Sequence, residues 1–327
     1  MKGGDPAYAF GPVPSRRLGR SLGINNIPAK FCTYSCVYCQ VGRTTALRKI
    51  RSSFYDPECI VGEVRARVQK ARDDGEPIDY LTIVPDGDPT LDSRLADIID
   101  RLQPLGVPVA VITNGALTGR DDVRDALSGA AWVSLKVDAV QESVWRRINR
   151  PHPSLRLSSI QAGMRAFADA FPGRLTTETM LVNGLNDSDT HLRQVAGFLW
   201  ELAPHTAYLA IPTRPPAEKW VRAPDESRFN RAYQIFFERL PRVEGLTGYE
   251  GDAFASTGDA EADILSVTAV HPMRGDAVRA LLGKAGAEWA VVDAMVGRGD
   301  LAVTEYQGHW FYLRRFHSTN NGGVQPT

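Results

Sequence analysis

Three of the four cysteines in this 327-residue chain lie in the stretch FCTYSCVYCQ, at Cys32, Cys36 and Cys39. Cysteines spaced C-x3-C-x2-C on one loop can turn their sulfur atoms toward a common centre. An iron–sulfur cluster is normally held by four thiolates, so a cluster held by three keeps one iron open. An open position is what a reactive metal site needs and a structural site avoids. The spacing therefore indicates a metal site with three protein ligands and room for a fourth.

Two other uses of these cysteines stay open. A structural zinc site takes four ligands, but neither Cys59 nor any of the six histidines has a companion spacing. A disulfide with one free thiol fits poorly, because so few cysteines do not form a secreted disulfide framework. We therefore expect a cytoplasmic, reducing location. A zinc-stabilised scaffold and an iron–sulfur sensor that binds nucleic acid remain alternatives to an enzyme.

Short β-branched runs alternate along the chain with segments of helical period. The runs are 21–25, 80–86, 107–114, 132–138, 175–182 and 206–213. The first predicted helix follows Asp56, which can cap it, and further helices are predicted at 92–103, 119–128, 154–170, 188–202 and 225–240. This alternation predicts a parallel sheet of right-handed βαβ units. Periodicity alone leaves an open sheet and a partial barrel as alternatives.

The sequence CTYSCVYC, with an aromatic residue directly before its last cysteine, resembles the signature loop of the radical S-adenosylmethionine (SAM) superfamily. The resemblance covers about residues 10–250 and implies a partial (β/α)6 TIM-like barrel of parallel strands. It also implies a [4Fe–4S] cluster on Cys32, Cys36 and Cys39, with SAM chelating the fourth iron. One electron would then split SAM into methionine and a 5′-deoxyadenosyl radical, which abstracts hydrogen from a substrate that the sequence does not identify.

The same resemblance implies which residues contact SAM, near the C-terminal ends of the predicted strands, where barrel active sites lie. PDGDPTL looks like the glycine-rich element that holds the SAM amino group, although the family most often has Glu where this chain has Asp88. VNGLND is similar to the family's adenine-side element. The predicted SAM contacts are Gly87, Asp88, Pro89, Thr90, Asn114, Ser134, Lys136, Asp138, Val182 and Gly184. From the residues alone, Asp88 could instead cap a helix, and Lys136 and Asp138 could form an ordinary ion pair.

The pattern changes after about residue 255. ADILSVTAV, GDAVRALLGKAG and EWAVVDAMVGRG predict three short helices, and two strands follow around Gln307-Gly308, an arrangement that resembles a winged helix. We therefore divide the chain into a barrel at 1–255, a winged-helix-like domain at 256–316 and a disordered tail at 317–327. Residues 258–316 carry eight Asp/Glu against six Lys/Arg, whereas a DNA-binding face is basic. We expect the module to pack on protein rather than on DNA.

The N-terminal segment is basic, although the whole chain has zero formal net charge. Residues 1–51 contain nine Lys/Arg and one acid, Asp5. Arg16, Arg17 and Arg20 could neutralise an anionic cluster or dock the phosphates of an RNA substrate. GPVPSRRLGRSLGI, INRPH (148–152) and RPPAEKW (214–220) resemble the wyosine-type tRNA-modifying synthases. Those enzymes bind a second cluster through cysteines upstream of the first, and this chain has none before Cys32.

Two expectations concern the surroundings of the protein. The resemblance implies an electron donor of flavodoxin or ferredoxin type. No segment approaches the ~20 apolar residues that span a bilayer, so we expect no membrane association. The reductant, the oligomeric state and the fate of SAM, consumed or regenerated, stay open.

Overall fold

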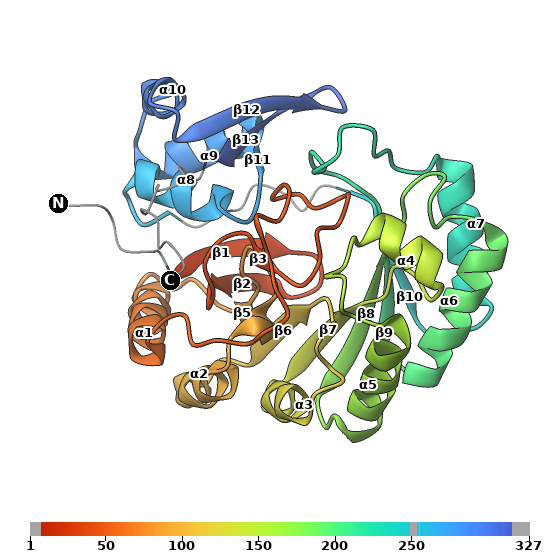
Figure 1. Cartoon of the computed structure of the whole chain (residues 1–327). Helices are drawn as coiled ribbons and strands as arrows, with labels where there is room; N and C mark the ends of the chain where they lie inside the picture. Colours follow the sequence, from red (N-terminus) through yellow and green to blue (C-terminus); the bar gives the residue numbers. More distant parts are fainter. Residues whose placement is uncertain (1–7, 249–253, 255, 316–327) are drawn as a thin grey trace, which may run out of the picture.

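The computed structural model describes residues 8–248, 254 and 256–315 (Figure 1). Its main sheet has eight strands in the order β1-β2-β5-β6-β7-β8-β9-β10 and curls into a half-barrel. β1 (Ala9–Ser15) pairs antiparallel with β2 (Gly19–Ile24), and every later pairing in this sheet is parallel. The order is open, with β1 and β10 (Val243–Leu246) at its edges. The structure therefore confirms the partial barrel.

The six predicted strands and the six helices predicted between them are present. The remaining strands of that set are β5 (Tyr80–Ile83), β6 (Val109–Thr113), β7 (Trp132–Lys136), β8 (Arg174–Met180) and β9 (Thr206–Ala210). The helices are α1 (Pro57–Asp73), α2 (Leu95–Leu102), α3 (Asp121–Ser128), α5 (Leu157–Ala170), α6 (Asp189–Leu202) and α7 (Glu226–Phe237). The sequence analysis did not predict β1, β10, or the seven-residue α4 (Glu142–Ile148). β1 reads AFGPVPS, and its two prolines are tolerated because it lies at the sheet edge.

The barrel core lies between the outer face of the sheet and the helices around it (Figure 1). α1 illustrates how the sequence builds this layer: Asp56 accepts a hydrogen bond from the Glu58 amide at 3.0 Å, and Ile60, Val64 and Val68 turn one apolar stripe inward. Alternate residues of the strands face the inside of the half-barrel instead. Their side chains line the candidate site described below.

The C-terminal module packs beside β1 (Figure 1). It consists of α8 (Ala260–Thr268), β11 (Met273–Arg274), α9 (Gly275–Ala285), α10 (Ala290–Gly297), β12 (Leu301–Tyr306) and β13 (His309–Arg314). The three predicted helices and the hairpin are present, and β11 adds an unpredicted strand to a sheet of order β11-β13-β12. Its classification as a winged helix stays a prediction. The proposed domain boundary at residue 255 and the predicted tail at 317–327 lie outside the described residues.

One hydrophobic core joins this module to the barrel. Phe10 and Val13 of β1 belong to the same buried cluster as Ile264 and Val267 of α8. The ring of Phe10 lies over Gly23, where a Cβ atom would come within 2.0 Å of it. The first strand is therefore shared between the two parts of the chain. Among the described residues, none of the helices has both the length and the apolar character to cross a membrane.

Candidate functional site

A cavity of about 330 Å³ lies on the inner face of the half-barrel. Cys32, Cys36 and Cys39 line it, and so do two of the predicted SAM contacts, Gly87 and Lys136. Its volume falls in the range of about 300–1,000 Å³ that is typical of small-molecule sites. The cavity is therefore the candidate active site.

The cysteine loop brings three partly buried thiols to the cavity. The Cys39 amide donates to the Cys36 carbonyl at 3.1 Å, which turns the loop tightly between these two cysteines. Burial raises the pKa of all three thiols, and that of Cys36 to about 12, with the nearby Asp138 carboxylate as the next cause. A nucleophilic cysteine needs the opposite shift. These thiols are instead suited to be metal ligands, because a bound metal supplies the positive charge that buried thiolates require.

Side-chain amides approach two of the sulfur atoms. The Asn114 amide nitrogen lies 3.5 Å from Cys32 Sγ, and that of Asn149 lies 3.4 Å from Cys36 Sγ. Donors of this kind stabilise thiolate ligands. Within the residues that the structure describes, no three His, Cys, Asp or Glu side chains are placed to share a single metal ion. An iron–sulfur cluster requires a different arrangement, because each thiolate binds its own iron atom. The three cysteines fit such a cluster.

Gly87 joins the end of β5 to the cysteine loop. Its φ is +154°, and a Cβ atom here would lie 1.8 Å from the Phe31 carbonyl oxygen. The same carbonyl accepts a hydrogen bond from the Asp88 amide at 3.2 Å, and the Lys30 amide donates to the Asp86 carbonyl at 2.8 Å. Only glycine permits this close approach of the two backbones. The glycine-rich element and the cysteine loop therefore form one rigid corner of the cavity.

Asp88 is buried behind this corner and is absent from the cavity wall. Its carboxylate accepts hydrogen bonds from the hydroxyls of Thr113 at 2.7 Å, Thr90 at 3.1 Å and Thr33 at 3.3 Å. Burial raises the pKa of Asp88 despite these donors. The side chain also accepts from the Thr90 amide and so caps the turn η1 (Pro89–Leu91), as its second interpretation predicted. In this structure Asp88 braces three segments that carry the site.

Asp86, which the sequence analysis did not single out, lines the cavity instead. Its carboxylate forms an ion pair with Lys30 at 3.0 Å. Burial is the main cause that raises the pKa of Asp86 to about 6. A carboxyl group with this pKa changes its charge near neutral pH at the wall of the cavity.

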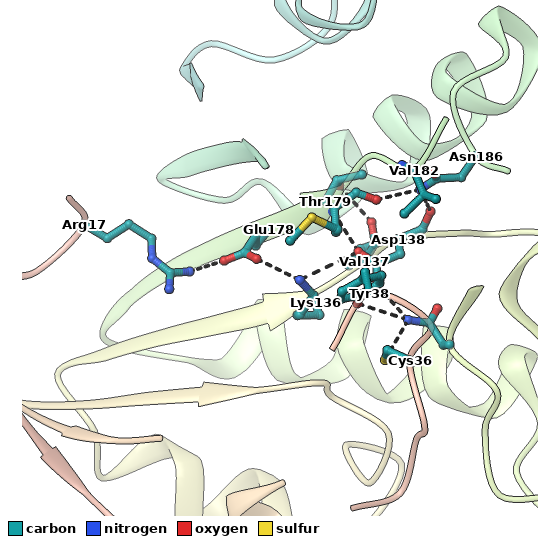
Figure 2. A network of polar contacts seen from close by, with 12 residues as sticks. Arg17, Cys36, Tyr38, Lys136, Val137, Asp138, Glu178, Thr179, Val182 and Asn186 are labelled. Atoms are coloured by element: carbon teal, nitrogen blue, oxygen red, sulfur yellow. Dashed lines mark hydrogen bonds and ion pairs between the residues drawn. The ribbon is translucent and has the colours of Figure 1, made fainter. Parts of the chain in front are cut away.

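A buried polar network crosses the half-barrel from the cavity to the cysteine loop (Figure 2). Lys136 of β7 donates to Glu178 of β8 at 2.7 Å, and Arg17 contacts the other oxygen of the same carboxylate. Lys136 also lies 4.0 Å from Asp138, so its predicted ion pair with Asp138 is present but longer than the one with Glu178. Burial would raise the pKa of Glu178, but the charges of Lys136 and Arg17 outweigh it and lower that pKa to about 2. Glu178 therefore stays ionised beside two partly buried cations.

Asp138 carries this network to the cysteines. Its carboxylate accepts hydrogen bonds from the Tyr38 hydroxyl, from the side-chain amide of Asn149 at 2.7 Å and from the backbone amide of Met180 at 2.8 Å. Asn149 reaches Cys36 with the same nitrogen atom. The predicted contact Asp138 thus lies outside the cavity lining, and Asn149 connects it to Cys36.

The other predicted SAM contacts lie outside the cavity lining. Ser134 of β7 is fully buried, and its hydroxyl has no hydrogen-bond partner among the described residues. The Val182 amide donates to Asn186 at 2.9 Å, and the Gly184 amide donates to Asp187 at 3.1 Å, which closes the turn after β8. Gly184 has a φ of +71°, which glycine tolerates best. Pro89 and Thr90 lie in the turn that Asp88 caps, and Asn114 lies beside Cys32.

The three N-terminal arginines do not share one surface. Arg16 and Arg17 line the cavity, whereas Arg20 forms an ion pair with Glu76 at 2.7 Å outside it. Glu178, which balances Arg17, was missed by the sequence analysis. The available signal was a carboxylate within the apolar and threonine-rich run LTTETMLV, where an inward-facing charge requires a partner. Cys59 is exposed on α1 and takes no part in the site.

The C-terminal module supplies one wall. Val270 and His271 line the cavity. Arg214, after β9, donates to His271 Nε2 at 2.7 Å and to the side-chain oxygen Oε1 of Gln40 at 3.0 Å. The side-chain nitrogen Nε2 of Gln40 donates to the Val270 backbone carbonyl at 3.0 Å. Gln40 directly follows Cys39. The module is thereby tied to the cysteine loop as well as to β1.

Sequence comparisons agree with this architecture. Residues 26–195 match the family model described as the radical SAM superfamily. The chain is 43% identical over 320 residues to the UPF0026 protein MJ1312 of Methanocaldococcus jannaschii, covering 97% of this chain and 99% of that protein. It is 30% identical over 239 residues to a UPF0026 protein of Helicobacter pylori, covering 72% and 75% of the two chains.

Solved structures share the fold. A radical SAM methyltransferase from Sphaerobacter thermophilus superposes with a TM-score of 0.52 at 19% identity, covering 72% of this chain and 69% of that one. TYW1 with a bound lysine-pyruvate adduct superposes with a TM-score of 0.51 at 17% identity, covering 68% and 74%. At these identities the likeness concerns the fold alone.

Proposed function

Because this chain belongs to the radical SAM superfamily, whose enzymes use SAM and an iron–sulfur cluster, we propose that it binds one [4Fe–4S] cluster through Cys32, Cys36 and Cys39. The cavity beside these cysteines would hold SAM and the substrate. One observation carries this proposal: the three partly buried thiols line one cavity together with Gly87 and Lys136. A cluster bound there would reductively cleave SAM and supply a 5′-deoxyadenosyl radical for hydrogen abstraction.

The residues of the chain would prepare this site in three ways. The raised pKa values of the three partly buried thiols disfavour free thiolates, and a bound metal would stabilise the thiolate form, which favours cluster binding over free cysteine chemistry. Lys136, Arg17 and Lys30 would place positive charge beside an anionic cluster, and Glu178 and Asp86 offset part of that charge. Val270 and His271 of the C-terminal module line the cavity and would restrict the entry of water into it.

Reduction of the cluster needs an external electron donor, and we propose a small acidic carrier of flavodoxin or ferredoxin type. Arg43, Arg48 and Lys49 follow the cysteine loop and are exposed, so they offer a basic surface close to the metal site. Opposite charges on two partners accelerate their encounter. A cytoplasmic location, where such carriers and reduced thiols occur, belongs to the same proposal.

An RNA substrate is the narrower alternative. Arg16 is exposed and lines the cavity, which supports phosphate contacts at this point. Arg17 is engaged with Glu178, however, and Arg20 pairs elsewhere, so the predicted arginine trio supports it less than the sequence suggested. The volume of the cavity favours a small molecule or a single flipped-out base over a folded polynucleotide.

The test uses anaerobically reconstituted full-length protein. Iron and sulfide are measured per chain, and dithionite and SAM are then added. We expect a cluster, and release of 5′-deoxyadenosine and methionine, from wild type and from Cys59→Ala, but neither from Cys36→Ala. Zinc in place of iron, or a full cluster without SAM cleavage, would refute the proposal. Transfer of deuterium into 5′-deoxyadenosine from labelled tRNA, and not from labelled small-metabolite extracts, would decide for the RNA alternative.

A further inference from the structure

The segment INRPH at 148–152 runs along the cysteine loop. The Val37 amide donates to the Ile148 carbonyl at 2.9 Å, and the Ser35 amide donates to the Asn149 carbonyl at 3.0 Å. The His152 amide donates to the Thr33 carbonyl at 2.9 Å. These bonds fall on alternate residues of the loop, as in the pairing of two short strands. The segment that resembled a tRNA-enzyme motif therefore holds the metal-binding loop.

A second contact holds the same loop from RPPAEKW at 214–220. The Glu218 amide donates to the Val37 carbonyl at 3.0 Å. Its carboxylate accepts both a two-pronged contact from Arg43, at 2.9 Å for each nitrogen, and a hydrogen bond from Arg150. Arg150 has a φ of +44°, a conformation that its neighbours must stabilise. Both motifs thus converge on the cysteine loop, which leaves the Asn149 side chain in a fixed position.

The Asn149 amide is aimed at the metal ligand. Asn149 is buried, and its amide nitrogen lies 2.7 Å from Asp138 Oδ2, 3.3 Å from the Tyr38 hydroxyl and 3.4 Å from Cys36 Sγ. The amide has only two N–H groups. The short bond to Asp138 takes one of them and orients the other toward the side of Cys36 and Tyr38.

The geometry points to Asn149 as a positioning residue that raises the reduction potential of the cluster bound through Cys36. The inference rests on the proposed function and deepens it. A reduced cluster carries one more negative charge than the oxidised one, so an N–H donor aimed at its sulfur ligand stabilises the reduced state more. Hydrogen bonds to the sulfur atoms are among the factors that set these potentials. Removing the amide should therefore make the cluster harder to reduce.

The test is a redox titration of the reconstituted full-length protein, followed by electron paramagnetic resonance and without SAM. Asn149→Leu, similar in size but without an amide, should shift the midpoint potential to a more negative value than wild type. Asn230→Leu, on an exposed position of α7, is the matched control and should not shift it. Asn149→Ser, which is too short to reach Cys36, should shift it in the same direction and serves if the leucine variant takes up no cluster.

Full iron and sulfide content with an unchanged midpoint potential in Asn149→Leu or Asn149→Ser would overturn the inference. So would a shift to a more positive value. Because the titration contains no SAM, its outcome is independent of SAM cleavage. A cluster that forms and shifts in potential without cleaving SAM would refute the proposed function alone.

Discussion

Lys136 and Glu178 face each other across neighbouring strands at 2.7 Å inside the half-barrel, and Arg17 contacts the second oxygen of the same carboxylate (Figure 2). One buried carboxylate therefore pairs with two partly buried cations at the cavity wall.

Glu178→Gln should be strongly destabilising, because it leaves Arg17 without its carboxylate partner and Lys136 with only the more distant Asp138. Removal of one partner from a buried ion pair costs about 3–5 kcal/mol. The free energy of unfolding in urea measures this change. Glu201→Gln, which breaks an exposed pair with Arg165, is the control and should change the free energy by less than about 1 kcal/mol. Equal effects of the two variants would contradict the buried network.

The same carboxylate predicts a pH dependence. The folded-state pKa of Glu178, about 2, lies below its unfolded value of about 4.3. Such a group stabilises the fold above the unfolded pKa and loses this contribution as pH falls through the folded one. The stability difference between wild type and Glu178→Gln should therefore be constant above about pH 5 and shrink toward pH 2. Unfolding series at several pH values check this, and a difference that grows in acid would contradict it.

Gly87→Ala should prevent assembly of the metal site, because its Cβ atom would lie 1.8 Å from the Phe31 carbonyl oxygen. The expected result is loss of most iron and sulfide after reconstitution. Gly197→Ala in α6 is the control, since nothing lies within 4 Å of the added atom and alanine favours a helix by up to about 1 kcal/mol. Normal cluster content in Gly87→Ala would show that the corner between β5 and the cysteine loop can relax.

Thr113→Val should lower stability by about 1–3 kcal/mol, because it removes the shortest hydrogen bond to the buried Asp88 carboxylate. Thr177→Val offers a matched control: Thr177 is equally buried, and its hydroxyl has no partner within the described part of the chain. The control should be neutral or stabilising. Thermal and urea unfolding measure the difference in stability between the two variants. Equal stabilities would show that the hydrogen bond from Thr113 to Asp88 does not stabilise the fold.

Phe10→Ala should loosen the C-terminal module from the barrel, because Phe10 packs on Gly23 and in the core shared with α8. A buried Phe→Ala change costs about 3–5 kcal/mol. Unfolding followed by hydrogen exchange should show the module opening before the barrel. Phe237→Ala, at a side chain that is 61% exposed, should cost less than about 1 kcal/mol. Unchanged protection of the module in Phe10→Ala would place the energy of docking elsewhere.

The sequence determined the parts of this protein that depend on local pattern. Strand and helix periodicity gave six βα units, because burial on one face requires alternation or a helical repeat of apolar residues. The C-x3-C-x2-C spacing placed three cysteines on one loop, because they are too close in sequence to lie far apart in the fold. Gly87 was recognisable as part of the glycine-rich element PDGDPTL. The structure gives the steric reason for glycine there, because a Cβ atom would collide with the Phe31 carbonyl oxygen.

Only the tertiary structure decided which distant side chains meet. Glu178 and Arg17 are 161 residues apart in sequence, and Asn149 and Cys36 are 113 apart, so no local period connects them. The structure also shows Asp88 as a buried brace, and it places INRPH and RPPAEKW against the cysteine loop. Contacts of this kind depend on how strands are ordered and how the sheet curls, and many sequences with the same periodicity would satisfy a different order.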